Sequence, residues 1–214
     1  HCQSPEAGGY TPSDFPLARI SQPDLDEILT HLPTEGNQPE LADLYPLTPL
    51  QQGIWFHELT ARESGIYFRR IVARLDGEMD IDLLKRAWQA VVDRHGILRT
   101  SLVWEGFDQP LQIVHPTVVL PWVQQEWRDR PATEEPERLQ TFLEEDRTRG
   151  FDFTQPPLMR LTLIQVAESK AILVWSYHHL ILDRWSIEEV QKDVWAAYQA
   201  LRRGEAVPDE KPRP

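Results

Sequence analysis

The chain has 214 residues, of which 41% are hydrophobic and 8 are tryptophan, which is enough apolar material for one folded domain with its own core. Its formal net charge of −12 disfavours nucleic acid as a partner, and no apolar run approaches the roughly 20 residues that a membrane helix needs. Cys2 is the only cysteine and no secretory signal is recognised, so we expect a cytoplasmic protein without disulfides or a cysteine-based metal site.

The two ends of the chain differ in composition from its middle, and this difference suggests the domain organisation. Residues 1–20 are rich in glycine, proline and serine, which is typical of a linker with little structure of its own. Residues 21–43 are predicted to form a short helix with Ser21 as its N-cap, followed by a loop. Residues 44–204 show regular apolar patterns and form the expected main body, and 205–214 are predicted to be an exposed tail.

The first half of the main body is predicted to contain a helix, a strand and a second helix. The first helix starts after Thr48, because Thr48 and Gln51 have the spacing of a capping box and Pro49 stands at the first helical position. Residues 66–75 alternate and are rich in β-branched and aromatic side chains, as strands are. The second helix ends at Gly96, and one apolar stripe of it faces the core: Leu84, Ala87, Trp88, Val91 and Val92.

The centre of the main body is predicted to hold two strands and a charged helix. The apolar stretches 97–106 and 110–116 are expected to be strands joined by a turn at Gly106–Asp108. A helix over 134–150 carries acidic residues at its start and basic residues at its end, which suits the helix dipole.

The last part of the main body is predicted to be a hairpin followed by a helix. Residues 157–177 contain two apolar strands, and residues 186–204 form a helix with Ser186 and Glu189 as its capping box. The mixed order of helices and strands predicts an α/β (α+β) sandwich, in which helices pack on a mostly antiparallel sheet.

Candidate chemistry concentrates where the hairpin ends, in the sequence AILVWSYHHLILDRWSIEEV of residues 171–190. His178 and His179 are adjacent at the end of a strand, so their side chains leave on opposite faces. We expect one imidazole to point into the structure and the other toward a cleft. Asp183 follows in the turn before the next helix, and such turns often present catalytic groups.

Four interpretations of this cluster require different chemistry. A metal site is disfavoured, because adjacent strand residues do not aim at one ion and no third histidine or cysteine is close in the sequence. A Ser–His–Asp hydrolase is disfavoured, because Ser186 lacks a G-x-S-x-G elbow and is explained as a helix cap. The residues alone leave two interpretations open: a purely structural cluster, or one catalytic histidine beside a structural aspartate.

The cluster resembles the HHxxxDG signature of condensation domains in nonribosomal peptide synthetases, and further stretches resemble other motifs of that family in the same order. LTPLQQGIWFHEL is similar to the first core motif, and RHGILRTSL to the second, RHexLRTxF. RGFDFTQPPLMRLTLI is similar to the FDlxxgPLlR segment. The lead-in GYTPSDFPLARISQPDLDEIL resembles the connector between a carrier domain and a condensation domain. The resemblance covers nearly all of residues 10–205.

The resemblance implies a chloramphenicol-acetyltransferase-like fold. Members of the family have two such lobes with an active-site tunnel between them, and this chain resembles the N-terminal lobe. Residues 1–20 then correspond to the carrier-to-condensation linker, and residues 205–214 to the inter-lobe linker. Because half of the tunnel wall belongs to the other lobe, this lobe alone is expected to be inactive.

The implied reaction is peptide bond formation, in which the amine of an acceptor aminoacyl group attacks a donor peptidyl thioester. Both substrates hang on phosphopantetheine arms of partner carrier domains, so no cofactor or metal is expected to bind this chain itself. The implied partners are the upstream donor carrier domain, the downstream acceptor carrier domain, the C-terminal lobe and an adenylation domain, with neither nucleic acid nor a membrane among them.

The resemblance also implies a role for each residue of the cluster. His179 matches the catalytic histidine, which acts as a general base or positions the amine, and His178 matches the inward, structural one. Asp183 matches an aspartate that makes a structural ion pair, for which Arg99 is the expected partner and Arg94 the second choice.

Arg184 departs from the family pattern, because it stands where the signature has glycine. In one interpretation its guanidinium folds outward onto a carboxylate such as that of Glu188. In the other, Arg184 and the neighbouring Trp185 line the acceptor side of the tunnel, where a cation gates the phosphopantetheine arm or favours a small or acidic acceptor.

Two other functions remain open at this point. Epimerisation domains share the histidine pair, so epimerisation or combined condensation and epimerisation is the enzymatic alternative. A non-catalytic condensation-like domain that docks or recruits partner proteins is the alternative of another class. The intact His179 argues against that second alternative, and Arg184 is the one feature that favours it.

Overall fold

The computed structural model describes residues 9–32, 34–35, 38–61 and 65–207. Its regular elements, with η marking a 3-10 helix, are η1 (Pro12–Asp14), α1 (Gln22–Thr30), β1 (Thr34–Glu35), β2 (Gln38–Pro39), β3 (Asp43–Pro46), α2 (Pro49–Thr60), β4 (Phe68–Asp76), α3 (Ile81–Arg94), η3 (Gly96–Arg99), β5 (Thr100–Val103), β6 (Leu111–Val114), β7 (Trp122–Glu126), η4 (Ala132–Glu134), α4 (Glu135–Arg149), β8 (Met159–Ala167), β9 (Lys170–His178) and α5 (Arg184–Arg202). Cys2, with the start of the predicted linker, and 208–214 of the predicted tail lie outside the described residues.

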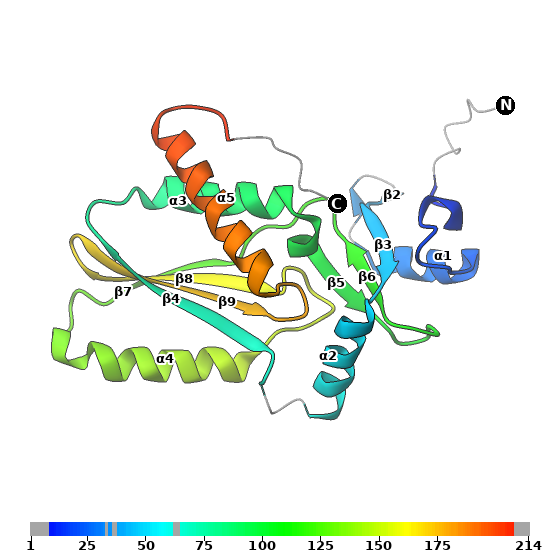
Figure 1. Ribbon diagram of the computed structural model, residues 1–214, viewed down its shortest axis with the longest axis horizontal. Coiled ribbons are helices and arrows are strands. Elements are labelled where there is room, and N and C mark those ends of the chain that lie inside the picture. The colour runs from blue at the N-terminus through cyan, green and yellow to red at the C-terminus, as the bar shows by residue number, and fades with distance from the viewer. Residues whose placement is uncertain (1–8, 33, 36–37, 62–64, 208–214) are drawn as a thin grey trace.

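A four-stranded sheet in the order β4–β9–β8–β7 forms the middle layer of the molecule. The predicted hairpin of β8 and β9 is confirmed, and β4 pairs antiparallel with β9 from Phe68, opposite His178, to Asp76, opposite Lys170. Strand β7 pairs parallel with β8 at one edge. Helices α3 and α5 cover one face of this sheet and α4 covers the other (Figure 1), which confirms the predicted sandwich of helices on a mostly antiparallel sheet.

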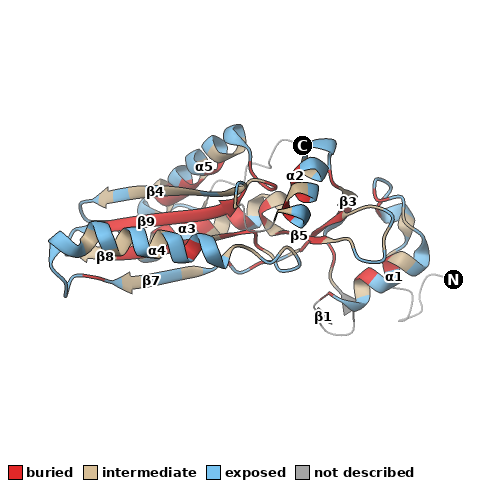
Figure 2. Cartoon of the chain, turned by 90° about the horizontal axis from the view of Figure 1, so that it is seen from below, coloured by how far each residue is buried: buried red, intermediate tan, exposed pale blue. Residues whose placement is uncertain are grey.

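Strand β9 is buried on both faces, and this determines where its last residues point. Alternate residues from Ala171 to Tyr177 pack into the core under α3 and α5, whereas Ile172 and Val174 pack into the core under α4. Figure 2 shows the strand buried along its length, between exposed outer helix surfaces. A strand covered on both sides reads as a continuous apolar run, as this one does, and its even-numbered side chains, His178 included, face α4.

A smaller sheet in the order β3–β6–β5 carries a second core with α1. Residues 9–20 contain η1 as regular structure, and their side chains pack: Phe15 and Ala18 are buried with Leu25 of α1 and Leu111 of β6. The end of the predicted linker is therefore held against this sheet.

The helix boundaries follow from local chemistry that the sequence predicts in most places. Thr48 caps α2 in a capping box with Gln51, as expected. The predicted apolar stripe of α3 is buried as a set, comprising Leu84, Ala87, Trp88, Val91 and Val92. Helix α4 ends at Gly150, whose φ of 57° lies in the left-handed region that favours glycine.

The start of α5 and the end of α3 differ from the sequence prediction. Helix α5 begins at Arg184 with Asp183 as its N-cap. Ser186, which was predicted to be the N-cap, lies three residues after Asp183, inside the helix. Helix α3 ends at Arg94, and Gly96 opens a short 3-10 helix in place of the first predicted strand residues. Aspartate and serine are both strong N-caps, and the structure uses the earlier of the two.

Strands β3, β7 and the short pair β1–β2 were not predicted. Strand β3 has four residues and ends in proline, and β7, with sequence WVQQE, is a partly exposed edge strand. Neither has the apolar alternation that identifies a strand in the sequence. Among the described residues, no helix is both long and apolar enough to span a membrane.

Candidate active site

The histidine pair lies where β9 leaves the sheet, and its two side chains have different surroundings. The backbone N–H of His178 donates to the carbonyl of Leu158 at 3.0 Å, and that of His179 donates to the carbonyl of Tyr67 at 2.8 Å. The side chain of His178 is buried, whereas that of His179 is partly exposed. The inward orientation expected for one imidazole agrees with the buried His178, and the expected opening of the other toward a cleft stays a prediction.

The imidazole of His179 is held in a single tautomer by the loop that follows it. Its Nδ1 lies 2.6 Å from the carbonyl oxygen of Leu182, and a carbonyl only accepts, so Nδ1 carries the proton. The neutral ring therefore presents the lone pair of Nε2, which is the atom that accepts a proton in general-base catalysis. The ring of Tyr67 stacks beside it, with centroids 6.4 Å apart and planes at 25°.

His178 takes the opposite tautomer, because its nearest backbone partner is a donor. The N–H of Leu180 donates to Nδ1 of His178 at 3.2 Å, so the proton of the neutral ring is on Nε2. That Nε2 lies 3.5 Å from Oε1 of the buried Glu58 on α2, and the ring of Phe153 meets the imidazole edge-on at 4.8 Å. His178 is thus enclosed by packing and by polar contacts on the α4 side.

Asp183 serves as the exposed N-cap of α5. Its Oδ1 accepts hydrogen bonds from the backbone N–H of Ser186 at 2.8 Å and from the Ser186 hydroxyl at 2.7 Å. These two bonds, the backbone one first, hold the pKa of the Asp183 carboxyl below its usual range. The carboxylate fixes the start of α5 immediately after the histidine loop, which is a structural role of a different kind from the one expected.

The predicted ion pair of Asp183 with Arg99 or Arg94 is wrong. In the part of the chain that the structure describes, the Arg99 guanidinium donates to the backbone carbonyls of Val92, His115 and Pro116, so it ties η3 to the segment after β6. Arg94 forms an ion pair with Asp193 of α5 at 3.2 Å, beside a 2.7 Å contact between His95 and the same carboxylate. Both arginines therefore hold the scaffold, and among the contacts of the described residues neither is paired with Asp183.

Arg184 and Trp185 are the first two residues of α5, and both are exposed, with Trp185 75% accessible. Within the described ranges Arg184 makes no ion pair, so the interpretation in which it folds onto a carboxylate such as that of Glu188 is not supported. Both side chains lie on the surface a few residues from the His179 imidazole.

A buried carboxylate under the site escaped the sequence analysis. Oδ2 of Asp146 on α4 accepts from the Ser176 hydroxyl at 2.5 Å, and Oδ1 accepts from Arg160 Nε at 2.7 Å. Burial raises the pKa of Asp146, but hydrogen bonds from Ser176 and Arg160 outweigh it, and the net shift is downward. This network fixes β8 and β9 to α4 two residues before the histidine pair.

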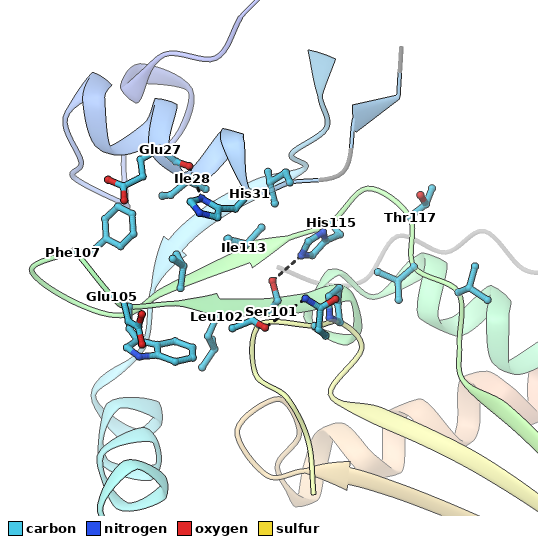
Figure 3. Close-up of a pocket in the computed structure, with 18 residues that line it drawn as sticks. Glu27, Ile28, His31, Ser101, Leu102, Glu105, Phe107, Ile113, His115 and Thr117 are labelled. Carbon is cyan, nitrogen blue, oxygen red and sulfur yellow. Dashed lines mark hydrogen bonds between the residues drawn. The ribbon is translucent and has the colours of Figure 1, made fainter. Parts of the chain in front are cut away.

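A cavity of about 1020 Å³ lies between α1 and the β5–β6 hairpin, and neither histidine of the pair lines it (Figure 3). Within it, the Ser101 hydroxyl and Nε2 of His115 are 2.7 Å apart, and both side chains are buried. Burial and then the charge of Arg99 lower the pKa of His115, which keeps the ring neutral. The pair joins β5 to the chain after β6, and we assign it a structural role.

Two residues of the site were not identified by sequence reasoning as parts of it. Gln51 was noted only as a capping residue, although its side chain also reaches the histidine loop. Glu58 carried a signal, because it follows Ile54 and Trp55 at helical spacing on the buried face of α2. A glutamate on an apolar helix face indicates a buried polar partner. The described residues hold no group of three or more His, Cys, Asp or Glu side chains that could bind a metal ion.

Comparison with known proteins gives the same family at the level of sequence. The condensation domain family matches residues 41–214. One of the linear gramicidin synthase subunits of Brevibacillus parabrevis is 44% identical over 207 residues, which cover 97% of this chain and 3% of that protein. Bacitracin synthase 1 of Bacillus licheniformis is 30% identical over 214 residues, which cover 100% of this chain and 4% of that protein. The chain thus spans a small fraction of the length of these relatives.

Solved structures agree with the fold. The starter condensation domain of rhizomide synthetase RzmA has a TM-score of 0.69 at 20% identity, covering 78% of this chain and 41% of that one. The first condensation domain of the calcium-dependent antibiotic synthetase, in complex with substrate analogue 3a, has a TM-score of 0.69 at 20% identity, covering 79% and 42%. The expected chloramphenicol-acetyltransferase-like lobe is confirmed. The chain belongs to the condensation domain family of nonribosomal peptide synthetases and is the N-terminal portion of such a domain.

Proposed function

We propose that this chain supplies the catalytic histidine of an enzyme that forms peptide bonds in nonribosomal peptide synthesis. The observation that carries the proposal is the state of His179, whose Nδ1 is bound to the Leu182 carbonyl at 2.6 Å while its side chain is partly exposed. A neutral imidazole with Nε2 available has the chemistry required of a general base near neutral pH.

In this reaction the acceptor is an aminoacyl group and the donor is a peptidyl thioester. The free α-amine has a pKa of about 8, so near neutral pH it is mostly protonated, and it gives its excess proton to water before it reacts. The neutral amine attacks the thioester carbonyl carbon, Nε2 of His179 accepts one N–H proton from the attacking nitrogen as the C–N bond forms, and the C–S bond breaks. The leaving thiolate receives the proton from the imidazolium, which returns His179 to its neutral state.

The substrates are proposed to arrive on phosphopantetheine arms of an upstream donor carrier domain and a downstream acceptor carrier domain, loaded by an adenylation domain. In this assignment residues 44–204 form the N-terminal lobe, residues 1–20 are the carrier-to-condensation linker, residues 21–43 are a linker helix and loop, and 205–214 are the inter-lobe linker. Exposed apolar side chains on α2 and at the start of α5 support a covering lobe: Leu50 at 74%, Phe56 at 68% and Trp185 at 75% accessibility.

Arg184 is proposed to act on acceptor choice. It is exposed at the first position of α5 and makes no ion pair within the described ranges, so its guanidinium is available to a substrate. Replacement by the family's glycine, Arg184→Gly, is expected to widen the range of accepted aminoacyl groups and leave folding intact. Identical acceptor profiles of the two proteins would remove this role.

The test is a condensation assay on the two-lobed enzyme that contains this chain. Donor- and acceptor-loaded carrier proteins are mixed with it, and the product on the acceptor carrier is measured by intact-protein mass spectrometry. Losing a general base slows such reactions about 10²- to 10⁴-fold, and we expect a loss of that size in His179→Ala. His31→Ala, which removes an exposed imidazole that follows α1, is the matched control and should retain the wild-type rate.

Two results would contradict the proposal. An unchanged rate in His179→Ala would exclude the histidine as the base. Absence of product from the wild-type enzyme with every acceptor, although the carriers still bind, would favour a domain that recruits partner proteins. Release of product with an inverted donor Cα would instead identify combined condensation and epimerisation.

A further inference from the structure

We infer that helix α2 clamps the backbone N–H and carbonyl of Leu180 and thereby positions His179, with Gln51 and Glu58 as positioning residues. This inference rests on the proposed function for its effect on the reaction, and on hydrogen-bond geometry for the clamp itself. Leu180 directly follows His179, and α2 lies beside the connection from β9 to α5 (Figure 1).

The first contact is direct. Nε2 of Gln51 donates to the carbonyl oxygen of Leu180 at 3.0 Å and to Oε1 of Gln112 at 3.0 Å. Oε1 of Gln51 accepts from the backbone N–H of Thr48 at 2.9 Å and from Nε2 of Gln112 at 3.2 Å. Both ends of the carboxamide are thus used, so its rotation is fixed, and the buried Gln112 on β6 anchors it to the second sheet.

The second contact runs through His178. The N–H of Leu180 donates to Nδ1 of His178, which requires the proton of that ring to be on Nε2. Nε2 lies 3.5 Å from Oε1 of Glu58, and neither atom has a hydrogen-bond partner in the described part of the chain. Both residues are buried, so the carboxyl group of Glu58 stabilises the one tautomer that can accept from Leu180.

The two contacts act on successive peptide groups, because the N–H of Leu180 lies in the peptide group shared with His179 and its carbonyl lies in the next one. Gln51 and Glu58 are seven residues apart, which is two turns of α2, so a single rigid helix sets both. The carbonyl of Leu180 and its N–H are fixed by separate groups, and the loop then turns so that the carbonyl of Leu182 meets Nδ1 of His179. A displacement of a catalytic group by about 1 Å costs about 10²-fold in rate, so a clamp of this kind is expected to matter for turnover.

The clamp is tested first without any activity measurement. The chain is labelled with ¹⁵N in its histidine rings and backbone, and NMR reports the tautomers of His178 and His179 and the hydrogen exchange of the Leu180 amide. In Gln51→Glu, the oxygen that accepts from Thr48 remains but the donor to Leu180 is lost. We expect at least tenfold faster exchange at Leu180 in this variant and in Glu58→Leu.

The matched controls separate the clamp from general effects on α2. Gln52→Glu makes the same chemical change one residue later, where the side chain donates to the carbonyl of Leu47 instead, and its Leu180 exchange should equal that of the wild type. Glu58→Gln keeps a polar oxygen next to Nε2 of His178 and should restore most of the protection lost in Glu58→Leu. If Glu58→Leu does not fold, Gln51→Glu and Glu58→Gln still provide the comparison.

The same variants are then assayed in the two-lobed enzyme. We expect kcat to fall about 10- to 100-fold in Gln51→Glu and Glu58→Leu, with KM within about twofold and near wild-type values in Glu58→Gln and Gln52→Glu. Unchanged Leu180 exchange and unchanged histidine tautomers in Gln51→Glu and Glu58→Leu would overturn the clamp, whatever the enzyme does. Failure of the wild-type enzyme to form an amide would refute the proposed function and leave the NMR result to decide the clamp.

Discussion

Replacing Asp146 with alanine is expected to destabilise this fold far more than the same change at Asp183. The Asp146 side chain is 2% exposed and that of its partner Arg160 is 12% exposed, at a distance of 2.7 Å. Removal of the carboxylate leaves a buried guanidinium without its counter-charge and leaves Arg160 Nε and the Ser176 hydroxyl without their acceptor. Breaking one side of a buried ion pair costs about 3–5 kcal/mol, whereas loss of an exposed N-cap costs about 1 kcal/mol.

Urea unfolding of the chain, followed by tryptophan fluorescence, measures both changes against the wild type. We expect Asp146→Ala to lower the free energy of unfolding by about 3–5 kcal/mol and Asp183→Ala, its control on α5, by about 1 kcal/mol. Equal losses in the two variants would refute the assignment of Asp146 as the buried carboxylate that joins α4 to the sheet.

The pH dependence provides an independent check of the same carboxylate. The pKa of Asp146 is lower in the folded than in the unfolded chain, so its contribution to stability is fully present above the unfolded pKa of about 3.9. It is lost as the pH falls through the folded pKa. The difference in stability between the wild type and Asp146→Asn should therefore be constant from pH 7 to about 5 and shrink below about 4. A difference that grows on acidification would contradict this.

Further predictions concern stability elsewhere in the lobe, and urea titration measures each. Gly150→Ala should cost about 1–2 kcal/mol because of its φ of 57°, whereas Gly53→Ala, inside α2 with open space around it, should stabilise by about 0.5–1 kcal/mol. Arg160→Lys should destabilise by more than about 1 kcal/mol, since an ammonium group cannot reproduce the bonds of the guanidinium to both Asp146 and Gly150. Because burial lowers the pKa of His115, stability should fall as the pH drops through about 6.5, and His115→Gln should flatten that slope.

Local signals in the sequence predict the helices and the long hairpin well. The capping box at Thr48 lies within four residues, and the apolar stripe of α3 within four turns, so each is complete in one stretch of sequence. The cap of α5 was misplaced because Asp183 and Ser186 are both good caps three residues apart, and sequence alone does not rank them. Strand β7 was missed because its own sequence lacks apolar alternation, and its extended conformation depends on parallel pairing with β8.

The charged contacts of the site were beyond local reasoning. Asp146 and Arg160 are 14 residues apart on α4 and β8, and only the packing of that helix on the sheet brings them together. The family resemblance supplied the role proposed for His179 but misdirected the partner of Asp183. A motif preserves the residue types of a site, whereas the ion pairs around it depend on neighbours that the motif does not contain.

The two adjacent histidines take opposite tautomers because the backbone offers them opposite partners. At His178 the nearest backbone group is the N–H of Leu180, which takes the lone pair of Nδ1 and leaves a proton on Nε2. At His179 it is the carbonyl of Leu182, which accepts a hydrogen bond from Nδ1–H, so that Nε2 carries the lone pair. A strand end followed by a tight loop creates both conditions within five residues. The surroundings of both imidazoles therefore depend on the same loop. A change that released the backbone of Leu180 would alter the tautomers of both His178 and His179.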